Sequence, residues 1–507
     1  MVTYTPYSSY INEISPDELF EGLLGYGLFS DKIPPFLSSV QFFEHQNAHP
    51  IKPSRNRGKY IYYESIRDTN VPRQHGIPNP FLYCKLCKCL SDNWPRIQSH
   101  FQNNTQAQAY KISRIHIRKI ANSRVLFKMN YKNWKDDPSP EPDFLIGKRW
   151  QISADISTCF PSIYTHSLPW ALVGKESAKS RTNKTYWFNR IDSCARSLTD
   201  GETHGVLIGP HASNLLSEIV LVVIDNNLYS QGWEFVRYID DYTCYTNTYE
   251  KGQEFLCALS RELRDFGLVL NSKKSKVQQL PLAATKQWTR QLKSLEYLIE
   301  KDVVSYKHVQ SYLDQVIEIM ACNNNESSIL NYALRMLAKR QLSKNAKDYC
   351  AKTVLHYSII YPYLVPFLDE LLVIPFGITS DLLEQPLQEV FTNNIKGRNF
   401  EAASYAIYLS MKYGCALSEL NSDSVINSGD CILMLSGYLY FLHNNLADQV
   451  NNMKAYAVEL ASDNDGFERN WLFFYEVLDS THLDKEWKEL KDAGVSFIDT
   501  SAFISSV

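Results

Sequence analysis

Apolar and polar positions alternate differently before and after about residue 300. In the first part, residues 150–156 and 234–244 are apolar runs rich in strand-forming residues and predict β-strands. Residues 212–229 and 249–266 carry apolar side chains at helical spacing and predict helices. Residues 136–143 are rich in Asp and Pro and predict a loop. The first part is therefore expected to mix strands and helices.

The second part of the sequence predicts helices in series, with few strand-like runs. Successive amphipathic helices are expected over residues 305–322, 326–341, 346–360, 380–394, 399–413, 430–444, 446–461 and 466–479. Short connectors between them favour stacked helical hairpins, as in a HEAT-like solenoid. The sequence shows no clean repeat, so a simple helical bundle is the alternative. We predict an α+β domain over residues 1–300 and an all-α domain over residues 301–507.

The composition describes an ordinary soluble chain. Of its 507 residues, 44% are hydrophobic and 21% are charged. Residues 1–10 do not resemble a signal peptide, and prolines interrupt the most apolar stretch, residues 357–378. We therefore expect no membrane partner. Eleven scattered cysteines favour a reduced, cytoplasmic protein. Cys84, Cys87 and Cys89 lack a second pair at zinc-finger spacing, so they predict small buried residues on a helix, with zinc as the alternative.

Charge is distributed unequally along the chain. Residues 301–507 contain 16 Lys and Arg against 26 Asp and Glu, a net charge of −10, which leaves +7 for residues 1–300. A basic first part suits a nucleic acid or a nucleoside triphosphate as partner. The acidic second part argues against a nucleic-acid contact over its whole surface.

The segment Tyr238-Ile-Asp-Asp241 is the most informative motif. It stands between two strand-like runs and therefore predicts a tight turn that carries two adjacent carboxylates. Like charges at such a tip repel one another, and a divalent cation removes that cost. A third carboxylate, Asp155, ends the strand predicted over residues 150–156. If these strands are neighbours, the three carboxylates form the kind of site that two-metal phosphoryl transfer needs. A solvated turn and a helix cap are the alternatives.

The order of four motifs resembles the palm of reverse transcriptases. Asp155 with Phe160 comes first, followed by residues 205–213, by Tyr238-Ile-Asp-Asp241 and by Leu270-Asn-Ser-Lys-Lys274. The resemblance implies a palm-and-fingers fold in residues 1–300 and a DNA nucleotidyltransferase that uses Mg²⁺ or Mn²⁺. It implies that Asp155 and Asp240 hold the metal ions, with Asp241 in support and the carbonyl of Ile156 as a further ligand.

The same resemblance implies nucleotide contacts. Phe160 matches the steric-gate position, where a ring excludes a ribose 2′-hydroxyl and selects deoxynucleotides; a core aromatic is the alternative. Gly209 and Ser213 match residues that line the nascent base pair. Lys274 matches a lysine near the leaving pyrophosphate, and a surface lysine is the alternative.

Three arginines upstream are candidate nucleotide contacts. Arg73, in Arg73-Gln-His-Gly-Ile-Pro78, resembles the fingers arginine that grips a triphosphate. Residues 113–119 alternate basic and apolar side chains and predict a fingers strand with one basic face. Arg114 and Arg118 on that face are rival triphosphate or template contacts. A solvated basic face is the alternative for all three.

The chain departs from most reverse transcriptases in two places. Leu207-Ile-Gly209 stands where the family usually has Pro-Gln-Gly, and a helical array replaces the thumb. With residues 22–39 and 160–172, these departures are similar to the Abi polymerases, bacterial abortive-infection proteins of phage defence related to AbiK, AbiA and a prophage-borne Abi polymerase. That resemblance implies DNA synthesis from dNTPs without a template, primed by a tyrosine hydroxyl, in a ring-like homo-oligomer (a trimer or hexamer).

Protein priming would leave a single-stranded DNA product covalently attached to the chain. Tyr7, Tyr10 and Tyr26, in or near the N-terminal segment, are the candidate priming residues. Two other functions remain open at this point. One is a conventional RNA-templated reverse transcriptase of a defence system that uses a dedicated non-coding RNA. The other is a catalytically idle polymerase fold that serves as a sensor, against which the intact carboxylates argue.

Overall fold

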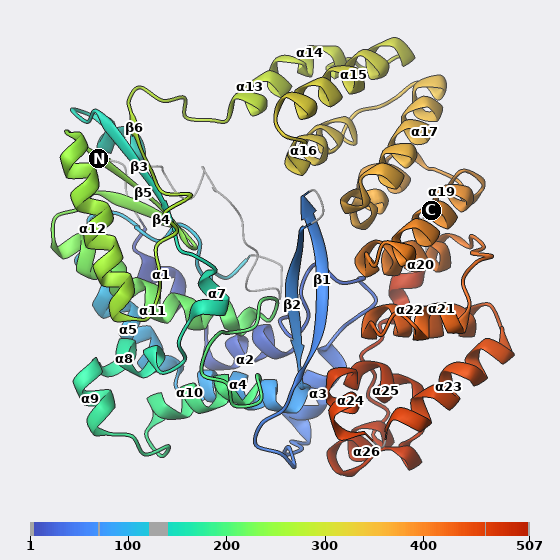
Figure 1. Ribbon diagram of the computed structural model, residues 1–507, viewed down its shortest axis with the longest axis horizontal. Helices are drawn as coiled ribbons and strands as arrows, with labels where there is room; N and C mark the ends of the chain where they lie inside the picture. The colour runs from blue at the N-terminus through green and yellow to red at the C-terminus, as the bar shows by residue number, and fades with distance from the viewer. Residues whose placement is uncertain (1–4, 69–70, 121–139, 462, 505–507) are drawn as a thin grey trace. The chain divides into compact units, whose positions relative to one another are not determined.

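The computed structural model describes residues 5–68, 71–120, 140–461 and 463–504 (Figure 1). Its internal contacts divide the chain into two compact units. Unit 1 comprises Met1–Ser30, Ser38–Tyr60 and Gly76–Leu282, and unit 2 comprises Asp31–Leu37, Ile61–His75 and Ala283–Val507. The division expected at residue 300 had placed both early segments of unit 2 in the first domain.

Unit 1 combines twelve described helices with a four-stranded sheet. The helices are α1 (Tyr7–Asn12), α2 (Pro16–Leu24), α3 (Val40–Ala48), α4 (Pro80–Asp92), α5 (Trp94–Thr105), α6 (Glu141–Leu145), α7 (Cys159–Ser162), α8 (Ser167–Val173), α9 (Lys175–Ser180), α10 (Trp187–Ser197), α11 (His211–Ser230) and α12 (Tyr249–Asp265). The helices predicted over residues 212–229 and 249–266 are confirmed as α11 and α12.

The sheet is antiparallel, with the strand order β4-β5-β3-β6. Its strands are β3 (Trp150–Asp155), β4 (Phe235–Tyr238), β5 (Asp241–Thr246) and β6 (Lys276–Gln279). The strand predicted over residues 150–156 is confirmed, and the run over 234–244 forms the hairpin β4–β5. Because side chains alternate along a strand, this register decides which residues share each face.

One face of the sheet packs against α12. Gly252 permits the close approach, because a Cβ there would lie 3.1 Å from Val277 and 3.2 Å from Ile152. On the opposite face, Phe144 packs with Val236 and Tyr245 in a small hydrophobic cluster. Figure 1 shows α12 running beside the strands, with α11 below them. Unit 1 therefore presents one sheet face that is covered by helix and one that carries polar side chains near the β4–β5 turn.

Two expectations for unit 1 are wrong. Residues 113–119 form no strand, because their pairing is limited to an isolated bridge between Ser113 and Arg237. Of the loop expected over residues 136–143, positions 136–139 lie outside the described residues and Glu141 begins α6. The cysteine prediction is confirmed in part: all three cysteines lie on α4, where Cys87 and Cys89 are buried and Cys84 is half-buried.

Unit 2 is helical apart from the hairpin of β1 (Tyr60–Asp68) and β2 (Val71–Pro78), most of whose residues belong to it. Its α-helices are α13 (Gln287–Ser294), α14 (Glu296–Ile299), α15 (Tyr306–Cys322), α16 (Ser327–Leu337), α17 (Lys344–Ile360), α18 (Ile374–Phe376), α19 (Ser380–Lys396), α20 (Phe400–Tyr413), α21 (Ser422–Ile426), α22 (Cys431–His443), α23 (Ala447–Ala461), α24 (Asn464–Arg469), α25 (Trp471–Val477) and α26 (Lys485–Asp492). Short helical turns η1 (Pro362–Phe367), η2 (Asp369–Val373), η3 (Ser480–His482) and η4 (Thr500–Phe503) complete it.

The predicted helical series of the second part is confirmed, with one change. The helix expected over residues 466–479 is two helices, α24 and α25, which meet at Asn470. Neighbouring helices in sequence pack on one another, as α19 does on α20. The finer description as HEAT-like stays a prediction.

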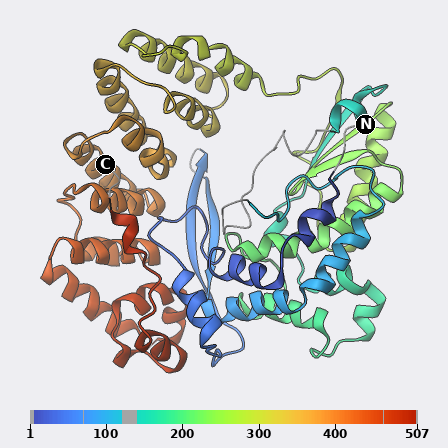
Figure 2. The same ribbon diagram turned by 180° about the vertical axis from the view of Figure 1, so that it is seen from behind.

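The two early segments of unit 2 are bound into its helical core. The Tyr405 hydroxyl donates to the carbonyl of Ile33 at 2.8 Å, and the N–H of Ile66 donates to the Glu401 carboxylate at 2.8 Å. The ring of Phe36 stacks on Phe503 with centroids 5.4 Å apart. Figure 2 shows the same chain from behind, with the hairpin in blue and the helices from α13 onward in yellow to red.

Among the described residues, none of the helices combines the length and the apolar character that crossing a bilayer requires.

Candidate active site

Three carboxylates converge at the end of the central strand pair. Ligand oxygens of Asp155, Asp240 and Asp241 all lie within 4.8 Å of one another. The strand register explains this, because Asp155 is paired directly with Asp241 across β3 and β5. Directly opposed residues project from the same face, and two like charges in that position destabilise a sheet. The structure therefore brings together the three residues that the sequence motifs singled out.

The turn that carries Asp240 is backbone-strained. Tyr238 pairs with Asp241, so Ile239 and Asp240 form a two-residue hairpin connection. Ile239 has a φ of 60°, a left-handed conformation that is rare for a β-branched residue and costs on the order of 1–3 kcal/mol. The carbonyl of Asp240 accepts a hydrogen bond from the N–H of Ile156 at 3.2 Å. Strain at such a turn persists only where surrounding contacts enforce the conformation.

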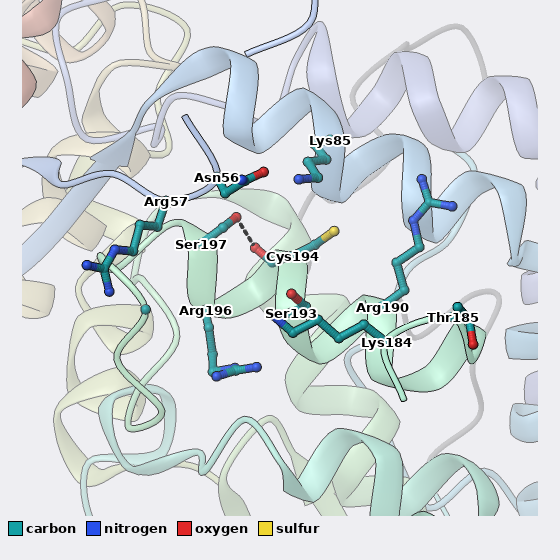
Figure 3. A pocket seen from close by; sticks show the side chains of 11 residues that line it. Asn56, Arg57, Lys85, Lys184, Thr185, Arg190, Ser193, Cys194, Arg196 and Ser197 are labelled. Atoms are coloured by element: carbon teal, nitrogen blue, oxygen red, sulfur yellow. Dashed lines mark hydrogen bonds between the residues drawn. The ribbon is translucent and has the colours of Figure 1, made fainter. Parts of the chain in front are cut away.

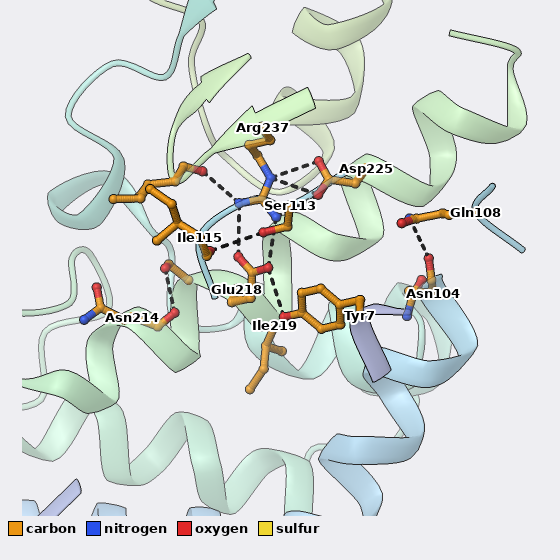
Figure 4. Close-up of polar contacts among 12 residues, drawn as sticks. Tyr7, Asn104, Gln108, Ser113, Ile115, Asn214, Glu218, Ile219, Asp225 and Arg237 are labelled. Carbon is orange, nitrogen blue, oxygen red and sulfur yellow. Dashed lines mark hydrogen bonds and ion pairs between the residues drawn. The ribbon is translucent and has the colours of Figure 1, made fainter. Parts of the chain in front are cut away.

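Arg237 supplies such a contact from beneath the turn. Its side chain is fully buried, and Nη1 donates to the carbonyl of Ile239 at 2.8 Å. Along β4, Arg237 faces away from the carboxylate face, toward α11 (Figure 4). The same guanidinium binds Asp225 at 2.7 Å and Glu218 at 3.0 Å, both on α11. Arg237 thereby connects the β4–β5 turn, which carries Asp240, to α11.

The electrostatics of this buried group are those of a charged network. Burial by itself would lower the pKa of Arg237, but Asp225 and Glu218 raise it well above its ordinary value. Burial raises the pKa of Asp225 to about 6, against the opposing influence of Arg237. At neutral pH Asp225 and the Arg237 guanidinium are therefore ionised together. Removing one member would leave uncompensated charge in the interior.

The Asp155 carboxylate has two further neighbours from the segment after α12. Asn271 Nδ2 donates to Asp155 Oδ2 at 2.8 Å, and the Asn271 N–H donates to the Asp155 carbonyl at 2.7 Å. Lys274 Nζ lies 3.2 Å from the same Oδ2, although its side chain is 69% exposed. The structure thus places Lys274 at the carboxylate site, as the motif order suggested.

The residues expected around the nucleotide occupy varied settings. Phe160 is half-buried on α7, which argues against an ordinary core aromatic. Gly209 has a φ of 124°, which only glycine adopts readily. Ser213 is buried in the first turn of α11. Their roles, and that of the Ile156 carbonyl, stay predictions.

The candidate arginines do not form one basic face. Arg114 and Arg118 lie in an extended segment beside β4, where Arg114 is buried and Arg118 is half-buried. Burial and Glu141 raise the pKa of the Tyr238 hydroxyl, and the neighbouring Arg114 opposes this. Arg114 is therefore close to the Tyr238-Ile-Asp-Asp241 turn. Arg73 lies on β2 and is assigned to unit 2, whereas the carboxylates belong to unit 1.

The three candidate priming tyrosines differ sharply in access. Tyr7 is 1% exposed, and its hydroxyl donates to Glu218 at 3.0 Å (Figure 4). Burial raises its pKa well above 10. A hydroxyl in that network cannot attack a nucleotide without leaving it. Tyr10 and Tyr26 are half-buried, and the ring of Tyr10 lies 4.6 Å from Lys111 Nζ.

The motifs did not identify Arg237, Glu218, Asp225 or Asn271 as functional. One signal was present, since Glu218 and Asp225 flank the apolar run of residues 219–224 and, seven residues apart on a helix, share one face. A buried carboxylate pair on one face requires a partner cation. Nothing in the sequence around Arg237 indicates that it is this cation.

The arrangement suits a hard divalent cation. Oxygen ligands from converging carboxylates are what Mg²⁺ and Mn²⁺ prefer, and the opposition of Asp155 and Asp241 makes a cation favourable there. When bound, such ions neutralise charge on a reacting phosphate and ease deprotonation of an attacking hydroxyl. Of the chain's own groups, Asn271 orients Asp155, and Arg237 fixes the turn that carries Asp240.

Comparisons with known proteins found one family match and distant structural neighbours. Similar solved structures include telomerase from Candida albicans in complex with a fragment of telomeric RNA (12% identity, TM-score 0.30) and apo telomerase from Candida tropicalis (11% identity, TM-score 0.32). The alignments cover 67% and 73% of this chain. They cover 63% of the Candida albicans chain, which is less than two thirds of its length, and 71% of the Candida tropicalis chain. No curated protein matches. Residues 115–301 match the family described as Reverse transcriptase (RNA-dependent DNA polymerase), so this region is similar to reverse transcriptase domains.

Proposed function

We propose that the chain polymerises deoxynucleotides by metal-dependent nucleotidyl transfer at Asp155, Asp240 and Asp241. The observation that carries this proposal is the convergence of their oxygens within 4.8 Å on one sheet face. Asp155 and Asp240 are the proposed Mg²⁺ ligands, Asp241 and the Ile156 carbonyl complete the set, and Lys274 faces the leaving pyrophosphate. Half-buried Phe160 is the proposed selector of deoxyribose.

The finer proposal is an Abi-type defence polymerase that is primed by a tyrosine and works without a template, as a homo-oligomer. Its support is the sequence resemblance, above all Leu207-Ile-Gly209, where a polar template contact is missing. The burial of Tyr7 shifts the priming proposal toward Tyr10 and Tyr26. A templated reverse transcriptase with a dedicated RNA is the second candidate, favoured by the family match.

One incubation tests the reaction. Purified full-length chain is given Mg²⁺ and labelled dNTPs without added template or primer, and incorporation is followed. Asp240→Asn should abolish incorporation, because it removes a charged ligand from the metal site, while the exposed Asp265→Asn should retain it. Activity in Asp240→Asn at the level of the Asp265→Asn control would reject the assignment.

The products separate the finer alternatives. Product that migrates with the protein in denaturing gels and is released by protease supports protein priming, and free DNA ends reject it. Random product sequence supports synthesis without a template. A defined or repeated sequence, lost after ribonuclease treatment, supports the RNA-templated alternative.

A further inference from the structure

Unit 1 contains a strongly basic cavity away from the carboxylates. Its volume is about 620 Å³, and none of its lining residues is an expected catalytic or nucleotide contact (Figure 3). The lining comes from the end of the segment before β1, from α4, and from α10 with the residues before and after it: Asn56, Arg57, Lys85, Lys184, Thr185, Arg190, Ser193, Cys194, Arg196, Ser197 and Gly201.

Five of the lining residues are cationic and none is acidic. Two have an acidic neighbour outside the lining, since Arg57 lies 3.5 Å from Asp200 and Arg196 lies 3.3 Å from Asp192. For the other three cations, Lys85, Lys184 and Arg190, no carboxylate of the described chain lies within ion-pairing distance. Positive charges this close together repel one another, and a bound anion with several negative charges offsets that repulsion.

The cavity wall is a preformed scaffold. Arg190, Ser193, Cys194 and Ser197 follow one another at helical spacing along one face of α10. The segment opposite is tied to the end of this helix, because the N–H of Gly58 donates to the Ser197 carbonyl at 3.0 Å. Lys85, Arg190 and Arg196 therefore stand on helices, which lowers the entropic cost of binding a ligand. Lys184 lies in the segment before α10, which is tied to that helix because Asn189 Nδ2 donates to the Asn183 carbonyl at 3.0 Å.

Aromatic rings accompany the charges. The rings of Tyr186 and Phe188 stack with centroids 5.5 Å apart and planes 11° apart, and Tyr186 is 41% exposed directly after the lining residue Thr185. Exposed rings interleaved with Lys and Arg are typical of proteins that bind single strands, because bases stack on the rings while cations contact phosphates. A free phosphate compound would use only the cations, and a duplex could not offer an unstacked base.

We propose that this cavity binds the backbone of a single nucleic-acid strand, with phosphates at Lys184 and Arg190 and a base stacked on Tyr186. This proposal rests on the proposed polymerase function, because a polymerase must bind a nucleic-acid strand. The cavity lies apart from the carboxylates. It would keep the template or product strand bound between successive nucleotide additions.

The test measures binding separately from synthesis. Full-length Asp240→Asn protein is titrated, without dNTPs, against a fluorescent oligo-dT of about 12 nucleotides, a length within the usual site size. Adding Lys184→Gln with Arg190→Gln should weaken binding about tenfold or more and reduce the slope of log K against log salt by about 1.4. The matched control is Lys179→Gln with Arg261→Gln, which removes two exposed charges of unit 1 outside the cavity.

Further ligands identify what the cavity recognises. Tyr186→Ala should weaken binding of oligo-dT several-fold but leave binding of an abasic oligomer unchanged, because only the base stacks. Inorganic tripolyphosphate should compete poorly. Equal effects of the cavity and control pairs would overturn the proposal, and so would tripolyphosphate that competes as well as oligo-dT. Thermal melting of each variant distinguishes lost binding from lost folding. If the wild-type chain incorporates no dNTP while these results hold, the polymerase proposal fails and the binding site stands.

Discussion

Asn271 holds Asp155 by two hydrogen bonds, one to the carboxylate from its side chain at 2.8 Å and one to the carbonyl from its backbone at 2.7 Å. The pair fixes one metal-site carboxylate in position from a separate segment of the chain. An orienting contact of this kind typically affects metal affinity or activity by about 10–100-fold.

Asn271→Ala should therefore lower dNTP incorporation by about tenfold or more and raise the Mg²⁺ concentration required for half-maximal rate. Incorporation measured over a Mg²⁺ series checks this. The control is Asn103→Ala on the exposed face of α5. A lower rate with an unchanged Mg²⁺ dependence would show that Asn271 acts elsewhere than through Asp155.

Divalent cations should stabilise the fold as well as support the reaction. A cation that binds only the folded chain adds about 2.7 kcal/mol at 100 times its dissociation constant. We expect Mg²⁺ or Mn²⁺ to raise the unfolding midpoint and EDTA to reverse this. Asp241→Asn should gain less stability from the ion than wild type, because it replaces one of the three converging carboxylates by a neutral amide. An equal metal-induced shift in both proteins would contradict the site.

Arg237 should matter for stability and for activity separately. Arg237→Met leaves Asp225 and Glu218 buried without their cation and should cost about 3–5 kcal/mol in unfolding free energy. Arg237→Lys keeps the charge but lacks the forked donors that reach Ile239 and both carboxylates together. It should lose less stability while still lowering incorporation. Exposed Arg261→Met on α12 is the control for removing an arginine. Full activity in a folded Arg237→Lys protein would show that the turn does not need this support.

Phe160→Ala should change the choice of sugar. If the ring excludes a 2′-hydroxyl, its removal should raise kcat/KM for ribonucleotides relative to deoxynucleotides by about tenfold or more. Competition between matched rNTP and dNTP pairs measures this ratio. Phe43→Ala, at another half-buried ring on α3, serves as a control for aromatic truncation. An unchanged ratio would reject Phe160 as the selector.

The free energy of unfolding should depend on pH through Glu401 in unit 2. Burial raises the pKa of Glu401 from 4.5 to about 7, so the folded chain keeps a proton there that the unfolded chain has lost. Stability from this group is complete below pH 4.5 and is lost as the pH rises to 7, a change of about 3 kcal/mol. Glu401→Gln, which keeps an oxygen acceptor for Ile66, should match wild type at low pH and exceed it at pH 8. Exposed Glu389→Gln should show no such divergence in denaturant melts.

Apolar spacing in the sequence predicted the elements whose formation depends on nearby residues. The hairpin around Asp240 followed from two flanking apolar runs, and the helices after residue 300 followed from apolar spacing. The segment 113–119 was mistaken for a strand because its alternation looked amphipathic. In the structure its single bridge to Arg237 leaves it extended but outside the sheet, and Arg114 is buried with its apolar neighbours. Alternation predicts a strand only where a second strand is available to pair.

The three carboxylates could be predicted from the sequence, but the buried residues that hold their turn in place could not. Asp155, Asp240 and Asp241 are recognisable because chemistry demands those residue types in that order. Arg237 is an ordinary residue in a strand pattern, and its burial depends on two carboxylates of α11 that long-range packing brings beneath it. The basic cavity likewise combines residues more than 100 positions apart.

The discontinuity of unit 2 bears on how the chain is made. Asp31–Leu37 and Ile61–His75 leave the ribosome early, but their partners Tyr405, Glu401 and Phe503 are synthesised more than 300 residues later. A chain grows at roughly 5–20 residues per second. Those two segments must therefore wait tens of seconds without their native contacts while the rest of unit 1 is synthesised. A ribosome-bound intermediate with unit 1 folded and both segments accessible to protease is the expected result of this topology.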